Sequence, residues 1–238
     1  MKDKEYTVLS PEGVYVKRIF RDDNIIFDEY NLIYSEMWKN ADYDSNGCIY
    51  QRHGCKIEKG DIVLDIGANV GLFTNRAAHD GASKIISVEP SKLSFKCLLD
   101  NLPDNAEAYK FAISDKRGVE TLTTPNINHL GCATVSNIDE CYSTEKIYTT
   151  TIDDLYECGL IEKVDFLKID TEGCEVKIFK GLSDSTIEKL GIRKIAFEFH
   201  DNLDQSLMED LIHKRFVPMG FKFFVLFCTM NKIVNLWK

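Results

Sequence analysis

Short apolar runs alternate along this chain with stretches of helical periodicity. Runs rich in aliphatic residues at 62–66, 84–88 and 106–112 predict strands, and the segments 72–78 and 91–102 between them predict helices. Strands and helices that take turns predict a parallel sheet joined by right-handed crossovers. We therefore expect an α/β protein built on such a sheet.

The second half of the chain repeats this alternation after a less regular stretch. The pattern predicts, in chain order, a helix at 151–158, a strand at 164–169, a helix at 174–180 ended by Gly181, a strand at 192–199 and a helix at 206–214. Two final strands, 221–228 and 232–237, are joined by a turn at Met230 and Asn231, which predicts an antiparallel hairpin at the end of the sheet.

Two regions fall outside the alternation. Residues 1–57 contain tyrosines and tryptophan among many polar residues, which suits either a cap over a ligand site or a stabilising extension. Residues 121–148 interrupt the second half and are expected to form a loop or hairpin near a substrate. The domain division that follows is an N-terminal extension over 1–57 and one α/β domain over 58–238.

Composition excludes several classes of function. The chain has 238 residues and a formal net charge of −9, without the basic footprint of a nucleic-acid-binding protein. Its longest apolar run, 223–228, is far shorter than the roughly 20 residues that span a bilayer. The eight cysteines are scattered without a Cys-x-x-Cys pair, which favours reduced thiols in a cytoplasmic protein and gives no zinc motif.

The turn after the first strand of the sheet carries the most chemical information. Asp65 ends an apolar strand, and Gly67 and Gly71 remove side chains where backbone must pass close to a ligand. The next residues can open a helix whose free N–H groups attract an anion. The spacing Asp-x-Gly-x-x-x-Gly is not the Gly-x-Gly-x-x-Gly of dinucleotide enzymes, and the leading acid favours an amine-bearing ligand such as S-adenosylmethionine.

Several further motifs follow this turn in a fixed order: Val88-Glu89-Pro90, Thr151-Ile152-Asp153-Asp154-Leu155, Leu167 to Glu175, and Phe197-Glu198-Phe199-His200. Together with the turn they make the chain resemble the FkbM family of S-adenosylmethionine-dependent methyltransferases from Asp61 to Leu203. The resemblance implies the class I methyltransferase (Rossmann-like) fold, with a seven-stranded, mostly parallel sheet. It also implies methyl transfer, typically to an oxygen of a sugar or another small acceptor.

The resemblance and the strand ends together select candidate cofactor residues. Asp65 is expected to hold the amino group of S-adenosylmethionine, directly or through water, and Glu89 to accept the ribose hydroxyls. Small residues at 112–114 suit the adenine. The full predicted set is Asp65, Gly67, Ala68, Asn69, Gly71, Glu89, Pro90, Ala112, Ile113 and Asp170.

The candidate catalytic residues are Asp170, Glu172, Glu198 and His200, which follow or end the last two parallel strands. Such groups can orient an acceptor hydroxyl, take its proton or hold a divalent metal, although no metal site is predicted. Asp170 and His200 both remain candidates for the general base, and His129 is a weaker one. We expect Glu175 and Lys177 to be solvated helix positions.

Three other functions compete with methyl transfer. A non-catalytic S-adenosylmethionine-binding module is disfavoured by the full set of acidic residues and His200. An NAD-dependent oxidoreductase is disfavoured by the glycine spacing, and a nucleic-acid methyltransferase by the charge. The expected partner is a small-molecule acceptor, with no nucleic acid and no membrane, and the oligomeric state is not indicated.

Overall fold

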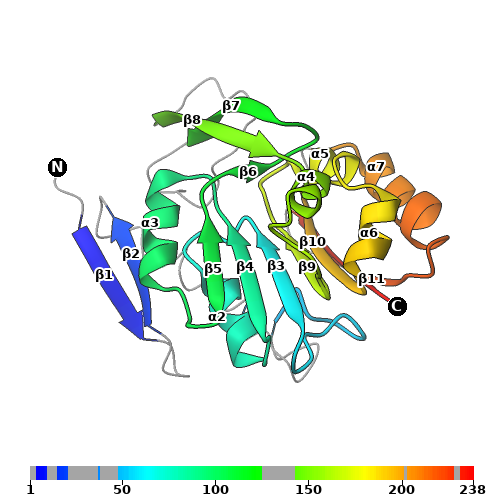
Figure 1. Cartoon of the computed structure of the whole chain (residues 1–238), viewed down its shortest axis with the longest axis horizontal. Coiled ribbons are helices and arrows are strands. Elements are labelled where there is room, and N and C mark those ends of the chain that lie inside the picture. The colour runs from blue at the N-terminus through cyan, green and yellow to red at the C-terminus, as the bar shows by residue number, and fades with distance from the viewer. Residues whose placement is uncertain are drawn as a thin grey trace.

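A seven-stranded sheet forms the centre of the protein in a computed structural model, which describes residues 4–9, 15–20, 37, 48–124, 143–200, 203–227 and 231–238 (Figure 1). The strands lie in the order β11-β12-β10-β9-β3-β4-β5. Their bounds are β3 Ile62–Ile66, β4 Lys84–Val88, β5 Ala106–Tyr109, β9 Phe166–Ile169, β10 Lys194–His200, β11 Lys222–Phe227 and β12 Asn231–Trp237. β12 runs antiparallel to both of its neighbours, β10 and β11, and the remaining pairs of this sheet are parallel, which confirms the predicted fold class.

Helices cover both faces of this sheet. They are α2 Leu72–His79, α3 Lys92–Asp100, α4 Ile152–Glu157, α5 Glu175–Lys180, α6 Asp184–Leu190 and α7 Gln205–Glu209, which continues as the π-helix η3 Asp210–Phe216. Neighbouring strand residues point to opposite faces, so Val63 packs in the core cluster of α2 and Leu64 in that of α4 to α6. The sheet is therefore buried on two sides, as parallel sheets are.

Two features of the fold differ from the sequence prediction. The strand expected at 106–112 ends at Tyr109, and Ala112–Ile113 forms β6 in a separate three-stranded sheet with β8 Ser143–Thr150 and β7 Gly118–Thr124. Apolar alternation does not reveal where a chain leaves one sheet for another. Helix α6 was not predicted, although Ser183 caps its first turn and Gly191 ends it in the left-handed conformation.

The N-terminal region contributes both a separate hairpin and part of the core. Strands β1 Lys4–Leu9 and β2 Tyr15–Phe20 pair antiparallel, and β2 lies toward α3 in Figure 1. Residues 48–57 pack into the core on the α2 side of the sheet. Most of the remaining extension, and the part of the predicted loop over 125–142 that contains His129, lie outside the described residues.

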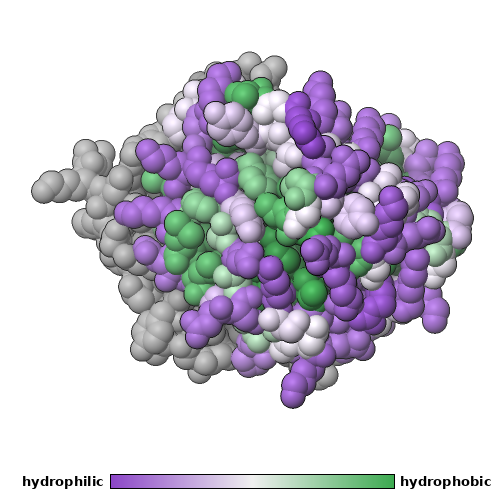
Figure 2. Space-filling model, in the orientation of Figure 1, coloured by the Kyte–Doolittle hydropathy of each residue, from purple (hydrophilic) through white to green (hydrophobic). Residues whose placement is uncertain are grey.

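The face of the molecule that Figure 2 shows is mainly hydrophilic. Figure 2 shows charged and polar side chains around the rim of one face, with hydrophobic ones near its centre, in the area where Figure 1 shows β3 to β5. Within the described ranges, no helix combines the length and the apolar character needed to cross a bilayer.

Candidate functional site

The carboxyl ends of β3, β4, β9 and β10 meet at one edge of the sheet. At this edge the Asp170 N–H donates to the Ile66 carbonyl (3.0 Å), and Gly67 lies against the Asp170 backbone. A Cβ on Gly67 would sit 1.7 Å from the Asp170 carbonyl oxygen, so only glycine fits there. Gly67 of the turn and Asp170 of the acidic motif, 103 residues apart in the sequence, are thus in contact.

The turn leads directly into α2. Asn69 and Gly71 have φ values of 50° and 92°, and Gly71 is the N-cap of α2 with no side-chain capping bond. The Gly67 and Ala68 N–H groups donate to the Val88 carbonyl (3.0 and 3.1 Å). The turn is therefore pinned to the end of β4, while the first helical turn lacks a side-chain cap.

Glu89 is a buried acid at the end of β4. Its Oε2 accepts the Asn69 N–H (2.9 Å) and its Oε1 accepts the Ser91 N–H (2.8 Å). Burial outweighs these bonds and raises the pKa of Glu89 to about 7. Pro90, which follows, is partly exposed.

Asp65 lies beneath the turn and is fully buried. Its Oδ2 accepts the Thr74 hydroxyl (2.7 Å), and its Oδ1 lies 3.2 Å from Lys168 Nζ. Direct contact between Asp65 and a ligand would require these groups to move, so the geometry favours an indirect role.

Lys168 joins the turn to the acidic motif. Its ammonium donates to the Gly67 carbonyl (2.8 Å) and lies 3.4 Å from Asp170 Oδ2. Burial alone would lower the pKa of Lys168, but the carboxylates of Asp65 and Asp170 raise it above its ordinary value. Lys168 is not among the predicted site residues, and its signal in the sequence is a single cation inside the apolar run 166–169.

Asp170 and Glu198 come together across β9 and β10. The Tyr50 hydroxyl lies 3.1 Å from Asp170 Oδ2 and 3.0 Å from Glu198 Oε2, and Asn231 Nδ2 donates to Glu198 Oε1 (2.6 Å). Phe197 and Phe199 point into the core, so Glu198 faces the opposite way, as the strand alternation predicts. Tyr50 and Asn231 reach the site from opposite ends of the chain.

His200 lies between two further carboxylates. Its Nδ1 is 3.1 Å from Glu175 Oε1 and its Nε2 is 3.2 Å from Glu172 Oε2. Burial lowers the pKa of an imidazole, but these contacts outweigh it and raise the pKa of His200 to about 11. Burial, with the charge of Asp170, raises the pKa of Glu198 to about 8.

The prediction that Glu175 is a solvated helix position is wrong. Glu175 is fully buried rather than solvated, and its Oε1 also accepts the N–H groups of Thr171 (3.2 Å) and Gly173 (3.1 Å). A carboxylate at the start of α5 can turn back onto the preceding loop, which helical periodicity does not distinguish from an outward-facing position. Lys177 is exposed as expected and lies 3.5 Å from Glu120.

The residues predicted to contact the adenine, Ala112 and Ile113, form β6. Ala112 and Ile113 pair with Thr149 and Thr150 of β8. Ile113 is buried in the same core cluster as Val88, at the end of β4, whereas Ala112 is half-buried.

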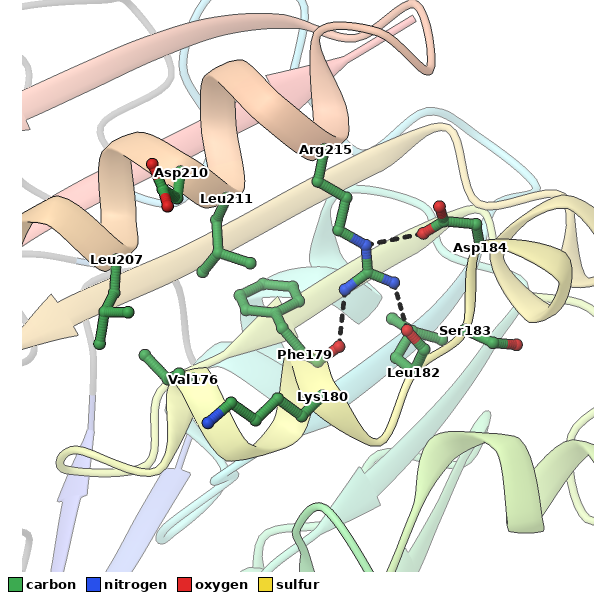
Figure 3. Close-up of a pocket in the computed structure, with 10 residues that line it drawn as sticks. All are labelled: Val176, Phe179, Lys180, Leu182, Ser183, Asp184, Leu207, Asp210, Leu211 and Arg215. Carbon is green, nitrogen blue, oxygen red and sulfur yellow. Dashed lines mark hydrogen bonds and ion pairs between the residues drawn. The ribbon is translucent and has the colours of Figure 1, made fainter.

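A cavity of about 510 Å³ lies elsewhere, between α5 and α6 on one side and α7 and η3 on the other (Figure 3). Arg215 dominates its polar lining: Nε donates to Asp184 Oδ1 (2.7 Å), Nη1 to the Phe179 carbonyl (2.6 Å) and Nη2 to the Leu182 carbonyl. These bonds tie η3 to the end of α5 and the start of α6. None of the residues predicted as functional lines this cavity.

The sheet order, the glycine turn and the acidic residues at neighbouring strand ends define the class I methyltransferase fold. The family model described as the methyltransferase FkbM domain matches residues 65–218. The chain therefore belongs to the FkbM methyltransferase family and is an S-adenosylmethionine-dependent methyltransferase by class.

Two curated relatives are similar over most of their length. The chain is 29% identical to the 31-O-demethyl-FK506 methyltransferase FkbM of Streptomyces tacrolimicus, over 88% of this chain and 86% of the relative. It is 23% identical to the hexuronic acid methyltransferase AglP of Haloferax volcanii, over 74% of this chain and 72% of the relative.

Two solved structures share the fold. Methyltransferase FkbM from Methylobacillus flagellatus has a TM-score of 0.53 at 14% identity, over 75% of this chain and 44% of that one. A putative S-adenosylmethionine-dependent methyltransferase from Streptococcus mutans has a TM-score of 0.56 at 13% identity, over 100% and 56%. This chain thus spans about half the length of these two proteins.

Proposed function

We propose that this chain transfers a methyl group from S-adenosylmethionine to a hydroxyl oxygen of a small polar acceptor such as a sugar. The observation that carries the proposal is the cluster of Asp170, Glu172, Glu198 and His200 beside the Gly67 turn. The names of the two curated relatives, which refer to a 31-O position and to a hexuronic acid, support an oxygen acceptor.

The residues at the Gly67 turn fit the cofactor. Glu89 uses two of the roughly four acceptor positions of a carboxylate on backbone N–H groups, which leaves room for two ribose hydroxyls. Asn69 Oδ1 is enclosed and has no hydrogen-bond partner among the described residues, and the N-terminus of α2 has no side-chain cap. These groups suit a ligand with both hydroxyls and a carboxylate.

When bound, S-adenosylmethionine supplies an electrophilic methyl group on a positively charged sulfur. Asp65 acts through Lys168, which holds the Gly67 carbonyl and Asp170 and so fixes the turn against the acidic cluster. Positioning an acceptor oxygen in line with the methyl group accounts for much of the rate gain in such a transfer.

Glu172 is the best-placed proton acceptor in the cluster. Its side chain is 30% exposed, compared with 9% for His200, both of whose ring nitrogens already face carboxylates. Glu172 also has a φ of 55°, a conformation that is uncommon for residues other than glycine and that is often found at functional sites.

Calorimetric titration with S-adenosylmethionine, combined with a transfer assay on hydroxylated acceptors, tests this proposal. We expect Glu89→Gln to weaken cofactor binding at least tenfold, and the exposed control Glu107→Gln to leave it unchanged. Glu172→Gln should keep cofactor binding and slow transfer by about 100-fold or more. NMR of a ¹³C-labelled methyl product should show an O–CH₃ carbon.

Two outcomes would overturn the proposal. A folded wild-type protein that binds no S-adenosylmethionine is not a methyltransferase of this kind. Binding without transfer to any hydroxylated acceptor in a panel of sugars, sugar acids and macrocyclic alcohols would point instead to a non-catalytic binding module.

A further inference from the structure

Three side chains from β10 and the loop after β9 converge on one point. Asp170, Glu198 and His200 can each offer one ligand atom, and these atoms lie within 4.8 Å of one another. Two carboxylates and an imidazole at this spacing are a donor set that divalent metal ions use.

The orientation of His200 is an independent feature that is typical of metal-binding histidines. The His200 side chain is 9% exposed, and its Nδ1 lies 3.1 Å from Glu175 Oε1. Backbone N–H groups of Thr171 and Gly173 hold this oxygen in place. A carboxylate on one ring nitrogen, which turns the other toward the ion, is the usual arrangement around metal-binding histidines.

The second ring nitrogen faces into the cluster. His200 Nε2 is enclosed and makes no hydrogen bond to any residue in the described ranges, although Glu172 Oε2 and Glu198 Oε1 lie within ion-pair distance, at 3.2 and 4.0 Å. Carboxylates around an enclosed ring nitrogen favour a cation at that point, either the ring proton or a metal ion that replaces it.

The negative charges of Asp170 and Glu198 are only partly offset by the groups around them. Both lie near the Tyr50 hydroxyl, whose single proton can be donated to only one of them at a time. Lys168 lies 3.4 Å from Asp170 but is shared with Asp65. A cation between Asp170 and Glu198 would offset their mutual repulsion.

We propose that Asp170, Glu198 and His200 bind one divalent first-row metal ion, with coordination positions left open toward the acceptor. The imidazole favours Mn²⁺, Fe²⁺ or Zn²⁺ over Ca²⁺, which takes oxygen ligands. Tyr50 and Asn231 act as positioning residues, because their hydrogen bonds orient the carboxylates.

The role of this ion rests on the proposed function. It holds the acceptor hydroxyl oxygen and lowers the hydroxyl pKa. The O–H proton passes to the Glu172 carboxylate, the new O–CH₃ bond forms, and the S–CH₃ bond breaks with its electron pair left on sulfur. The products are a methyl ether, S-adenosylhomocysteine and a protonated Glu172.

Mn²⁺ binding to the full chain, after treatment with a chelator that is then removed, tests the site. Calorimetry and the loss of the free Mn²⁺ signal in electron paramagnetic resonance both report binding without any acceptor. We expect one saturable site, weakened at least tenfold by Asp170→Asn and by His200→Gln. The exposed histidine variant His213→Gln is the matched control and should bind as the wild type does. Circular dichroism checks that each variant is folded.

The outcomes separate the two proposals. No saturable Mn²⁺ binding by the folded wild type, or binding that is equal in all variants, would overturn the metal site. Glu198→Gln gives a second variant if either of the first two fails to fold. Cofactor binding and transfer that persist in excess chelator would contradict the metal while leaving methyl transfer standing. Mn²⁺ binding without S-adenosylmethionine binding would support the metal site and contradict the proposed methyl transfer.

Discussion

Glu89, which we propose to bind the cofactor ribose, is a buried acid whose ionisation would link pH to cofactor binding. Its pKa is raised to about 7, chiefly by burial, with Lys168 and Asp65 as its charged neighbours. Because the folded-state pKa lies above the ordinary value of 4.5, the native state holds this proton more tightly than the unfolded chain does. The contribution of Glu89 to stability is therefore fully present below pH 4.5 and is lost as the pH rises through 7.

Cofactor binding should follow the opposite trend. If the Glu89 carboxylate accepts the ribose hydroxyls, the dissociation constant for S-adenosylmethionine should rise about tenfold between pH 8 and pH 6, since the acid is protonated over that range. Calorimetry at several pH values measures this. Glu89→Gln should bind weakly with little pH dependence, and an equally flat profile in the wild type would contradict the assignment.

At the residue scale, the sequence was informative where a residue belongs to a local motif. Asp65 and Glu89 end apolar runs, so their places at the strand ends could be predicted from the sequence. The contacts that keep Asp65 from facing a ligand directly could not be predicted. They come from Lys168 on another strand and from Thr74 on a helix. Partners that meet only through tertiary packing leave no local pattern.

At the scale of elements, Lys168 connects two strands through charge. It lies in β9 with 2% exposure and contacts Asp65 of β3 and the Gly67 carbonyl. Replacement by methionine keeps the length of the side chain but leaves Asp65 buried without its cation. We expect Lys168→Met to lower the free energy of unfolding by about 3 to 5 kcal/mol.

Urea unfolding followed by circular dichroism measures this loss. Lys177→Met, on the exposed side of α5, is the control and should change stability by less than about 0.5 kcal/mol. A loss below about 1 kcal/mol for Lys168→Met would show that Asp65 is adequately held by Thr74 and by water.

Helix α4 depends on a reciprocal cap at its first turn. Thr151 Oγ1 accepts the Asp154 N–H (2.9 Å), and Asp154 Oδ2 accepts the Thr151 N–H (3.2 Å). Thr151→Ala should cost about 1 kcal/mol in thermal or urea unfolding, because it leaves an N–H of the first turn unpaired. Thr144→Ala, an exposed threonine in β8, is the comparison. Equal effects from both variants would argue against a specific capping role.

At the scale of the whole molecule, the two edges of the sheet differ in charge balance. At the amino ends of the strands, Arg193 binds Asp61 (3.0 Å) and Asp165 (3.1 Å), and Lys194 binds Asp61 (2.8 Å) and Glu58 (2.8 Å). At the carboxyl ends, the described cations near the carboxylates around His200 are Lys168 and the His200 ring itself. Structural ion pairs thus fix one edge, while the carboxylates at the other edge support the cationic ligands that we propose there.

The sequence predicted this global arrangement only in part. Alternating strands and helices gave the parallel sheet and its antiparallel end, because both follow from periodicity and from the handedness of crossovers. The closing of the acidic site by Tyr50 and Asn231 was not predicted, since each reaches it through packing of segments 181 residues apart. The passage of the chain from one sheet to another between Tyr109 and Ala112 was not predicted either, because it also depends on tertiary packing.

The difference between the edges makes a prediction about Lys194, which is 4% exposed at the start of β10. Lys194→Met should lower the free energy of unfolding by about 2 to 3 kcal/mol, somewhat less than a fully broken buried pair, because Arg193 still contacts Asp61. The same variant should keep the dissociation constants for S-adenosylmethionine and Mn²⁺ within about twofold, since the site lies at the opposite end of the strands. Urea unfolding and calorimetry on one preparation measure both. A large loss of binding in folded Lys194→Met protein would mean that the amino-end ion pairs also set the position of Glu198 and His200, and that the two edges are not independent.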